Sequence, residues 1–278
     1  MIPAESGERS RRTLAISKTI GPVVVFVLFL GLWTFMNRWG MRTFFDKPSF
    51  LVPSPVETVR DSFFRSQPRG KLLNGLKWTA LVSLIGLAIS IVIGMSLAVL
   101  MAQAKWVENS TYPYLVALQA IPVLAVVPII SSVFDGGLNA RLFVCVMISI
   151  FPIVTNTLFG LTSPEPGQHD LFTLRGASRW TRLVKLQLPS ALPSIFTGFR
   201  ISAGLSVIGA VVGEQFFRQG SKPGVGIVME EFRHNSLYPL VFGGLIVAAF
   251  LGITVFLIFG RLSRLVTGKW YEAADKAR

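Results

Sequence analysis

Cysteine is nearly absent from the sequence, and its scarcity excludes several kinds of site. Cys145 is the single one, so the chain cannot form a disulfide of its own or a cysteine-based metal centre. It lies in an apolar run and is interpreted as a small buried side chain. The two histidines, His169 and His234, stand far apart, and no serine–histidine–acid or metal-ligand spacing links them. We therefore expect no catalytic residue and no metal site.

Charged residues are also scarce. They make up 15% of the 278 residues, whereas 51% are hydrophobic and the mean hydropathy is +0.58. A soluble protein of this size would need more polar surface to cover its core. Several runs approach or exceed the roughly 18–20 apolar residues that cross a bilayer. The composition therefore predicts an all-α integral membrane protein.

The net charge of +13 raises the alternative of a nucleic-acid-binding protein. The Lys and Arg residues lie between apolar runs rather than along one face, as cytoplasmic basic loops of membrane proteins do. We therefore expect a lipid bilayer, and no nucleic acid, as the partner. The sequence has no G-x-x-x-x-G-K-[ST] phosphate-binding loop, so this chain is expected to bind no ATP or other cofactor itself.

Six apolar runs predict six transmembrane helices. They cover about 19–36, 78–101, 113–134, 141–160, 194–217 and 238–260. The first run is longer than a usual signal-peptide core and lacks a small-residue cleavage site after it, so we interpret it as a retained span. An even number of spans puts both termini on one side, and the basic tails and the basic 161–193 segment favour the cytoplasm.

Two prolines lie in the third predicted span. Pro122 and Pro128 each remove a backbone hydrogen bond and are expected to bend the helix. Carbonyls freed in this way are tolerated in a membrane where other helices or a watery cavity satisfy them. Gln119 is the only sizeable polar side chain near the cytoplasmic half of this span. These three residues are candidates for the translocation pathway.

A short amphipathic helix is predicted between the first two spans. It would begin near Ser54, after a proline-containing stretch, with Val56, Val59 and Phe63 facing inward. Such a helix more often packs on the bundle or at the membrane interface than binds a ligand.

The polar and basic segment 170–193 separates two long apolar runs. Gly176 is expected to take the left-handed backbone that ends one short helix, and Ser178 is expected to cap the next. One side of that second helix would carry Trp180, Leu183, Val184 and Leu188. Pro189 would stop it. A helix–glycine–helix elbow exposed between two spans is suited to hold another protein.

Glu214 is a carboxylate inside the fifth apolar run, where a charge is costly. It is either a helix-end residue paired with Arg218 one turn on, or a lining residue at the mouth of the pathway. Arg200 lies near the cytoplasmic end of the same run and can extend toward the interface. The other five runs are interpreted as lacking the buried ionisable relays of ion-coupled transporters, which favours an external energy source.

These residues carry a family resemblance. Gly176 is followed by nine residues and then by L-Q-L-P at 186–189, which resembles the cytoplasmic loop of permease subunits of binding-protein-dependent ABC importers. That family's pattern reads E-A-A, three residues, G, nine residues, I-x-L-P. Its first three positions fall on D-L-F at 170–172, which keeps the acid and loses both alanines. The stretch GFRISAGLSVIGAVVGEQ that follows, with Glu214 at a common glutamate position, strengthens the resemblance.

The resemblance covers about residues 50–270 and implies a type I ABC importer permease fold that forms half of a dimeric pore. The chain would divide into a tail and first helix at 1–49, the transporter domain at 50–270 with its coupling loop at 161–193, and a cytoplasmic tail at 271–278. The coupling residues would be Asp170, Leu171, Phe172, Gly176, Ala177, Ser178, Arg179, Leu188 and Pro189.

The resemblance also implies the partners. The loop would fit a groove on an ABC ATPase subunit, and a dimer of that subunit would use ATP and Mg²⁺ to open a central cavity alternately outward and inward. An external solute-binding protein would deliver a small solute, and a second permease copy, a homodimer partner, would complete the pore in the bacterial plasma (inner) membrane.

The stretch IPVLAVVPII with the later FDGG resembles the branch of this family that serves nitrate, sulfonate, taurine, riboflavin or pyrimidine precursors. These residues do not identify the solute. A different class stays open at this point, namely a non-ABC membrane channel or scaffold whose basic loop docks a regulatory protein. A channel predicts conductance from the purified chain alone, whereas an importer permease needs a P-loop ATPase beside it.

Overall fold

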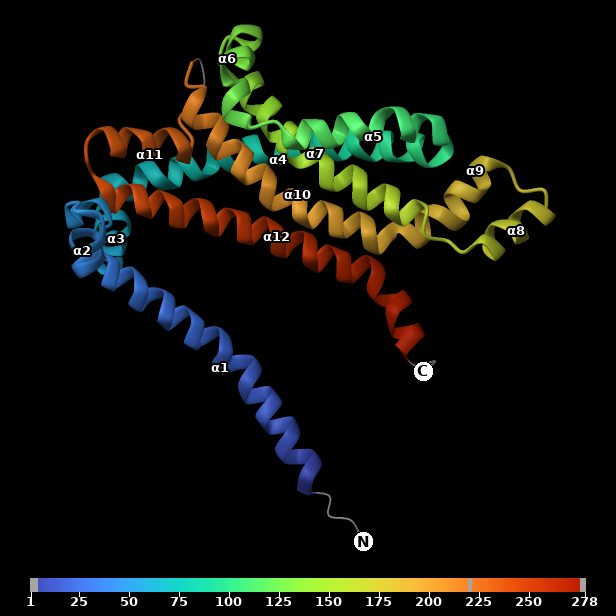
Figure 1. The fold of residues 1–278 in the computed structure, drawn as a ribbon, viewed down its shortest axis with the longest axis horizontal. Helices are drawn as coiled ribbons and strands as arrows, with labels where there is room; N and C mark the ends of the chain where they lie inside the picture. The colour runs from blue at the N-terminus through green and yellow to red at the C-terminus, as the bar shows by residue number, and fades with distance from the viewer. Residues whose placement is uncertain (1–4, 220–221, 276–278) are drawn as a thin grey trace. The chain divides into compact units, whose positions relative to one another are not determined.

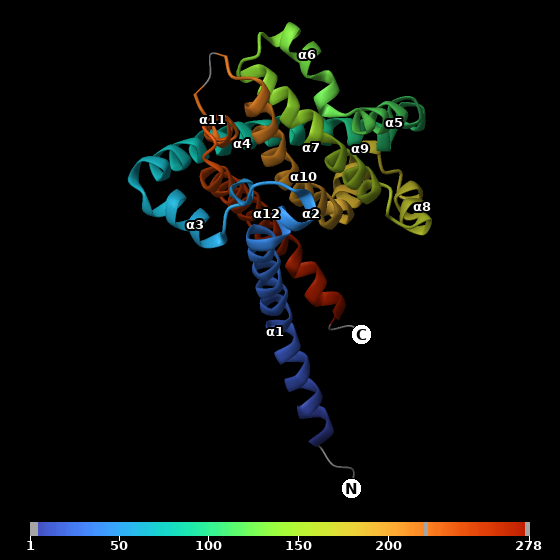
Figure 2. The ribbon, with the colours of Figure 1, turned by 60° about the vertical axis from the view of Figure 1, so that its left-hand side comes forward.

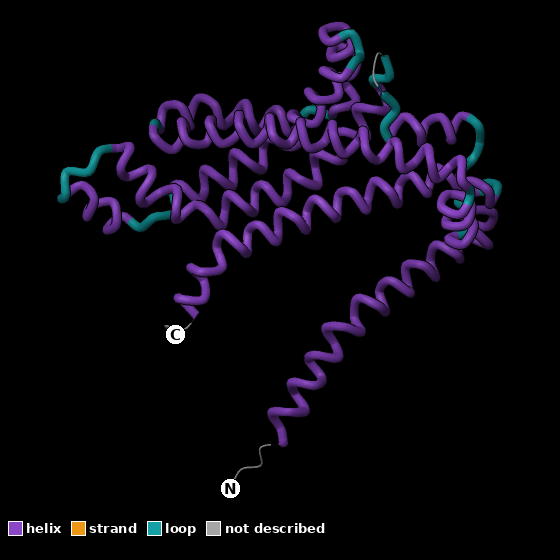
Figure 3. The backbone as a smooth tube through the Cα atoms, turned by 180° about the vertical axis from the view of Figure 1, so that it is seen from behind, coloured by secondary structure: helices purple, strands orange, loops and turns teal. Residues whose placement is uncertain are grey.

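The structure is a computed structural model, and it describes residues 5–219 and 222–275. These ranges are helical and contain no strand, as the all-α prediction requires (Figure 3). Helices α1 to α6 are Glu5–Phe35, Met41–Phe45, Pro55–Val59, Ser66–Gln103, Lys105–Ala120 and Val123–Phe134. Helices α7 to α12 are Leu138–Leu161, Pro166–Leu174, Arg179–Arg182, Leu188–Phe216, Val225–His234 and Tyr238–Asp275. Three π-helical turns cover Met36–Gly40, Arg60–Phe64 and Leu183–Gln187, and a 3-10 turn covers Ser49–Leu51.

Five helices of the described chain are long and apolar enough to cross a membrane, and a sixth span results if the pair α5 and α6 is counted as one. The two helices of this pair meet at 102°. The chain redirects at Ile121, which takes the extended backbone that a following proline favours. By contrast, α6 runs through Pro128 without interruption. The bend predicted at Pro122 is therefore confirmed as a sharp break, whereas Pro128 does not interrupt its helix.

The chain forms two compact units, each of which is considered by itself. One unit contains the chain up to Arg69 together with Phe232–Gly243. The other contains Gly70–Glu231 together with the chain from Gly244 onward. The second unit holds both the elbow and Glu214, so the candidate site is built within it.

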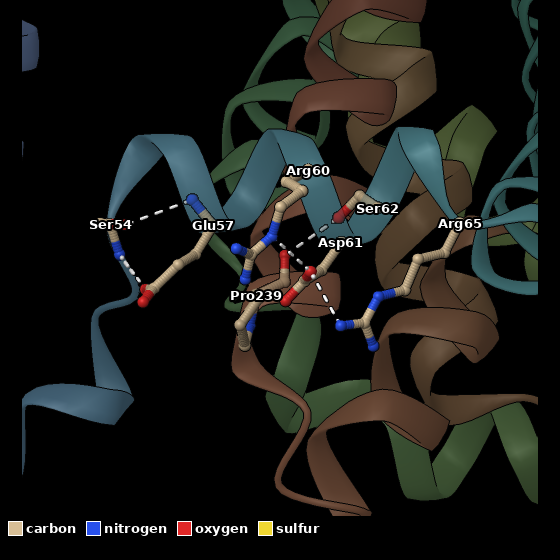
Figure 4. A network of polar contacts seen from close by, with 7 residues as sticks. All are labelled: Ser54, Glu57, Arg60, Asp61, Ser62, Arg65 and Pro239. Carbon is tan, nitrogen blue, oxygen red and sulfur yellow. Dashed lines mark hydrogen bonds and ion pairs between the residues drawn. The ribbon is translucent and has the colours of Figure 1, made fainter.

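In the first unit, α3 begins where the sequence predicts. Ser54 Oγ accepts a hydrogen bond from the Glu57 backbone N–H at 3.2 Å, and the Glu57 carboxylate accepts one from the Ser54 N–H at 3.1 Å (Figure 4). This reciprocal capping box satisfies two donors that the first helical turn leaves free. Just beyond it, Asp61 accepts from Arg60 at 3.1 Å and pairs with Arg65 at 3.3 Å (Figure 4).

The inward face predicted for this helix is wrong at Val56 and Val59, whereas Phe63 is half-buried. Thr58 and Ser62 are fully buried, whereas Val56 and Val59 are exposed. Ser62 Oγ donates a hydrogen bond to the Pro239 carbonyl at 3.1 Å, which gives the buried hydroxyl a partner (Figure 4). The buried side of α3 and of the π turn that follows it is therefore formed by hydroxyl side chains rather than by the two valines.

The core of the second unit lies among α4, α7, α10 and the part of α12 that belongs to this unit. Figures 1 and 2 both show α7 beside α10. One cluster of buried side chains joins all four helices and consists of Leu87, Ile153, Ala203, Val207, Leu251 and Val255. Membrane helices approach closely where small residues meet. Cys145, buried as predicted, is such a point: a Cβ added at Gly209 would lie 2.8 Å from its Cα, and one added at Gly86 would overlap its Cβ.

Gly86→Ala therefore tests the close approach of α4 and α7. The new methyl group is fixed to the backbone, so the helices must separate, and we expect a loss of about 1–3 kcal/mol. The measurement is the midpoint of thermal unfolding of the purified chain in detergent. Gly252→Ala is the matched control, because nothing lies within 4 Å of the methyl group it adds. Equal midpoints for the two variants would contradict the packing described here.

Candidate functional site

The elbow turns on Gly176, which has the predicted left-handed backbone with φ +64°. Its N–H donates to the Thr173 carbonyl at 2.9 Å, and the Ala177 N–H donates to the Phe172 carbonyl at 3.0 Å. These two bonds form a Schellman motif, which satisfies the last carbonyls of α8. The turn is therefore a defined structure rather than a loose loop.

The second arm of the elbow is capped and tied to the first. Ser178 Oγ accepts a hydrogen bond from the Thr181 N–H at 3.2 Å, which confirms the predicted cap of α9. Arg182 Nη2 donates to Thr173 Oγ1 of α8 at 2.9 Å. The two short helices thus hold one another at a fixed angle.

Pro189 does not stop this arm, contrary to the prediction. The chain passes from α9 through the π turn Leu183–Gln187 into α10, and Arg179–Phe216 is one helical stretch of 38 residues. A proline removes a donor and crowds the carbonyl four residues before it. The π turn widens the helix immediately ahead of Pro189, so the chain continues through the proline into the membrane-spanning segment.

The side chains of this arm that face the bundle differ in part from those predicted. Leu183 and Leu186 are buried, but Trp180 and Val184 are 71% and 42% exposed, so the predicted apolar side is wrong at the latter two. Leu186 follows Leu183 by three residues, a spacing that puts both side chains on the same face of a helix. At this base Leu183 packs with residues of α7 and α10. The buried Gln187 accepts a hydrogen bond from Gln103 of α4 at 2.8 Å through its side-chain oxygen.

The tip of the elbow is uncovered. Figure 1 shows α8 and α9 projecting past the ends of α7 and α10. Three large apolar side chains are open there: Leu171 is 54% exposed, Leu174 is 86% exposed and Trp180 is 71% exposed. The expected coupling residues that are exposed are Asp170, Leu171, Gly176, Ser178 and Arg179, and those half-buried are Phe172, Ala177, Leu188 and Pro189. An apolar patch on a polar, projecting loop indicates a protein-binding surface.

Glu214 lies near the other end of α10, where its side chain is fully buried. Its Oε2 accepts hydrogen bonds from Thr79 Oγ1 and from the Gly226 N–H, each at 2.9 Å. The Thr79 hydroxyl oxygen in turn accepts from the Val225 N–H at 2.8 Å. One carboxylate therefore ties α4, α10 and the first turn of α11 together.

A buried arginine completes this charge cluster. Arg141 of α7 is 1% exposed, and it donates from Nε to the Phe217 carbonyl at 2.7 Å and from Nη1 to the Lys222 carbonyl at 3.1 Å. Arg141 lies against the residue before Glu214, because a Cβ added at Gly213 would be 3.1 Å from the Arg141 Cα. Opposite charges this close in a buried region attract each other. The interpretation that no other span carries a buried ionisable group is therefore wrong. The predicted order of the spans could have indicated this proximity, because it puts the start of α7 and the end of α10 on the same side of the membrane.

Arg218 is not the partner of Glu214. It forms an ion pair with Glu230 of α11 at 3.4 Å, although it lies one turn after Glu214 in the sequence. The Glu214 carboxylate instead faces the 224–226 segment, where a Cβ added at Gly224 would overlap it. Of the two interpretations of Glu214, the structural one fits this burial, but the partner it named was wrong.

The other candidate pathway residues lie on the surface of the α5–α6 pair. Gln119 is in the last turn of α5, Pro122 is at the break, and Pro128 is in α6. All three are exposed. They therefore share the broken region that Pro122 creates, whereas Glu214 belongs to the buried cluster of α4, α7 and α10.

Comparison with known proteins decides the family. Residues 90–270 match the model of the binding-protein-dependent transport system inner membrane component family. The chain belongs to this family. It is 33% identical over 249 residues to the formylaminopyrimidine transport permease protein of Halalkalibacterium halodurans, covering 90% of this chain and 95% of that relative. It is 32% identical over 251 residues to the riboflavin transport system permease protein of Chloroflexus aurantiacus, covering 90% of each.

Solved structures show the same fold. An inward-facing MetNI methionine ABC transporter matches with a TM-score of 0.63 and 17% identity, over 73% of this chain and all of that one. A bacterial alginate ABC transporter matches with a TM-score of 0.60 and 13% identity, over 95% of this chain and all of that one. The expected importer-permease family and fold are confirmed. The chain is a multi-pass permease subunit of a binding-protein-dependent ABC importer for small solutes, and it works with an ATPase on a separate subunit.

The charge cluster predicts how Glu214 variants behave. Glu214→Ala removes the acceptor of the Thr79 hydroxyl and of the Gly226 N–H and leaves both donors buried without a partner, so we expect a loss of about 1–3 kcal/mol for each in unfolding free energy. Glu214→Gln keeps an oxygen for Thr79 and Gly226 and should lose less. The measurement is denaturant unfolding of the purified chain in detergent.

Glu108→Ala is the control for this series, because it removes only an exposed ion pair with Lys105 and should cost about 0–1 kcal/mol. The double variant Glu214→Ala with Arg141→Ala should lose less than the sum of the two single losses. Strict additivity would show that the two charges do not interact.

Proposed function

We propose that the elbow, residues 161–193, couples this permease to a dimer of ABC ATPase subunits that uses ATP and Mg²⁺, while this chain binds no cofactor. The observation that carries the proposal is the exposure of Leu171, Leu174 and Trp180 at the tip of a rigid elbow. Aromatic and large aliphatic side chains that are open in the free subunit are the usual anchors of protein interfaces.

The base of the elbow supports the same role. Leu183 is packed into the bundle, and Gln187 is hydrogen-bonded to α4. The base of the elbow is therefore fixed to the bundle, while its tip makes no packing contact of this kind with the described residues. Gly176, held by the Schellman bonds, acts as the hinge of the elbow, and residues 177–179 belong to its contact surface. At 170–172 this chain presents Leu171 and Phe172 where the family has alanines, so the groove on its ATPase must accept larger side chains.

The remaining partners follow from the permease family. An external solute-binding protein delivers the substrate, and a second copy of this chain completes the pore. The chain lies in the bacterial plasma membrane with both termini in the cytoplasm. Gln119, Pro122 and Pro128 are pathway candidates because they are exposed at a break between helices. Glu214 has a structural role instead, because its carboxylate accepts the hydrogen bond that holds the first turn of α11 against the bundle.

Trp180→Asp should remove ATPase binding at the elbow tip. The charge replaces an exposed anchor without touching the packed base, so membrane insertion should persist while co-purification of the ATPase subunit falls at least about tenfold. Trp106→Asp is the matched control, because Trp106 is 73% exposed on α5, on the same predicted side of the membrane. Equal loss of the ATPase in both variants would contradict a specific role of the elbow.

Cysteine labelling tests the orientation. Ser178→Cys should react with a membrane-impermeant maleimide only in inside-out vesicles, because position 178 is exposed on the elbow. Asn139→Cys, at the start of α7, should react only in right-side-out vesicles. The native Cys145 is buried and should contribute no background. The reverse pattern would overturn the topology and, with it, the coupling role.

A further inference from the structure

A small cavity lies between α4, α7 and the segment that joins α10 to α11, all within the second unit. Its volume is about 210 Å³. The apolar part of its lining comes mainly from one face of α4 and includes Trp78, Leu81 and Ile85. Two cations complete the lining, Arg141 of α7 and Lys222 of the joining segment. The cavity therefore combines two positive charges with an otherwise apolar wall.

The first cation, Arg141, has a donor without an acceptor. Its side chain is 1% exposed, and two of its three nitrogens donate to the Phe217 and Lys222 carbonyls. The third nitrogen, Nη2, is buried and has no hydrogen-bond partner among the described residues. Leaving a buried donor of a charged group unpaired is costly. Buried polar groups are nearly always hydrogen-bonded, so Nη2 calls for an acceptor that the chain itself does not supply.

The second cation, Lys222, is exposed and is held by an aromatic ring. Its Nζ lies 4.4 Å from the ring centroid of Trp78. The ring face attracts the ammonium and leaves N–H donors for an anion. In residues 5–219 and 222–275, no carboxylate lies within ion-pair distance of Lys222 or of Arg141. Glu214 balances part of the Arg141 charge but does not line the cavity, so Lys222 leaves it positively charged.

The cavity lies where two apolar helices begin. No charged residue follows Trp78 in α4, and none follows Arg141 in α7. Tryptophan and basic side chains concentrate at this boundary, at the level of the lipid headgroups. The boundary is at the opposite end of the bundle from the elbow, because Arg141 contacts the end of α10 and the elbow leads into its start.

The size of the cavity and its apolar side favour a lipid over a free solute. Sites that enclose a whole small molecule measure roughly 300–1,000 Å³, so this cavity fits a single group of a larger ligand. Leu81 is 46% exposed, Ile85 is 38% exposed and Leu138 is 45% exposed, so the apolar lining continues onto the open surface of α4 and α7. A ligand with an anionic head and an apolar tail matches both features.

We propose that this cavity binds the phosphate group of an anionic phospholipid, whose acyl chains lie along the exposed face of α4. Guanidinium and ammonium groups form strong, charge-assisted hydrogen bonds with phosphate oxygens, and basic pockets between transmembrane helices bind anionic headgroups. Phosphatidylglycerol is preferred to phosphatidylcholine, because the choline carries a cation that Arg141 and Lys222 repel. The lipid belongs to the leaflet opposite the elbow, which the proposed orientation makes the outer one.

Lys222→Gln tests this site in the purified full chain in detergent, where no assumption about orientation is needed. Native mass spectrometry measures the Kd of phosphatidylglycerol and of phosphatidylcholine. The unmodified chain should prefer phosphatidylglycerol. Lys222→Gln should weaken phosphatidylglycerol binding about tenfold, the effect of losing one hydrogen bond to a charged group, whereas Lys222→Arg should preserve it.

Lys77→Gln is the matched control. Lys77 is exposed and precedes Trp78 at the same interface, but it does not line the cavity. The same charge is removed, so the affinity for phosphatidylglycerol should stay nearly unchanged. An equal loss in the Lys77 and Lys222 variants would show diffuse attraction to a basic surface and would overturn the site. Equal affinity of the unmodified chain for the two lipids would overturn it as well.

Two further measurements separate the lipid from other anions. Phosphatidylglycerol should raise the midpoint of thermal unfolding by binding the folded chain, whereas inorganic phosphate alone should not. A rise with inorganic phosphate that Lys222→Gln abolishes would assign the cavity to a free anion instead. If Lys222→Gln leaves lipid binding intact but reduces co-purification of the external solute-binding protein with the whole transporter, the cavity docks that protein and the lipid proposal is wrong. Neither result bears on the elbow, whose coupling role is tested by ATPase co-purification.

Discussion

The second unit depends on the packing of α7 against α10. Cys145 of α7 lies against Gly209, and Ser202 Oγ of α10 donates to the Ser149 carbonyl of α7 at 2.6 Å. Lipid supplies no hydrophobic force between helices, so such close van der Waals and polar contacts are what hold them together. The elbow at one end of α10 and Glu214 at the other are positioned by this one helix, about 39 Å apart along its axis.

This arrangement separates the two tasks of a permease subunit. The elbow leaves its apolar side chains open for another protein while its base is packed. At the opposite end, Arg141 and Glu214 are buried and spend their hydrogen bonds on α4, α11 and the backbone between α10 and α11. Burying a charged group is costly unless hydrogen bonds offset the loss of water, and Glu214 Oε2 and Arg141 Nε each have such partners. Arg141 and Glu214 therefore stabilise the bundle through their buried hydrogen bonds. The exposed apolar side chains of the elbow are instead suited to bind another protein.

The sequence was sufficient wherever local chemistry decides the conformation. Gly176 and Ser178 behave as expected because a left-handed turn favours glycine and a helix start favours a serine oxygen. Pro122 redirects the chain because the residue before a proline avoids the helical region. The family pattern also predicted the importer-permease family, because the glycine and the leucine–proline pair of the 170–193 segment keep their spacing.

The failures have physical reasons too. A π turn has no simple sequence signature, and the one before Pro189 lies where the helix continues through the proline. Val56 and Val59 are exposed because the buried side of their helix carries Thr58 and Ser62, and Ser62 finds a hydrogen-bond acceptor in the Pro239 carbonyl. Arg141 was missed because a cation in the first turn of a span resembles an interfacial residue until its partner across the bundle is known. Which side chains become buried, and whether a helix continues through a proline, depend here on tertiary contacts that a local sequence pattern cannot predict.

The central claim is that a separate ATPase holds this permease by its elbow. The most direct measurement places the photo-crosslinking residue benzoyl-phenylalanine at position 180 in cells that express the whole transporter, and identifies the adduct by mass spectrometry. The account predicts an adduct with a subunit that contains a P-loop. An intact transporter that gives no such adduct from position 180, while position 106 does, would contradict it.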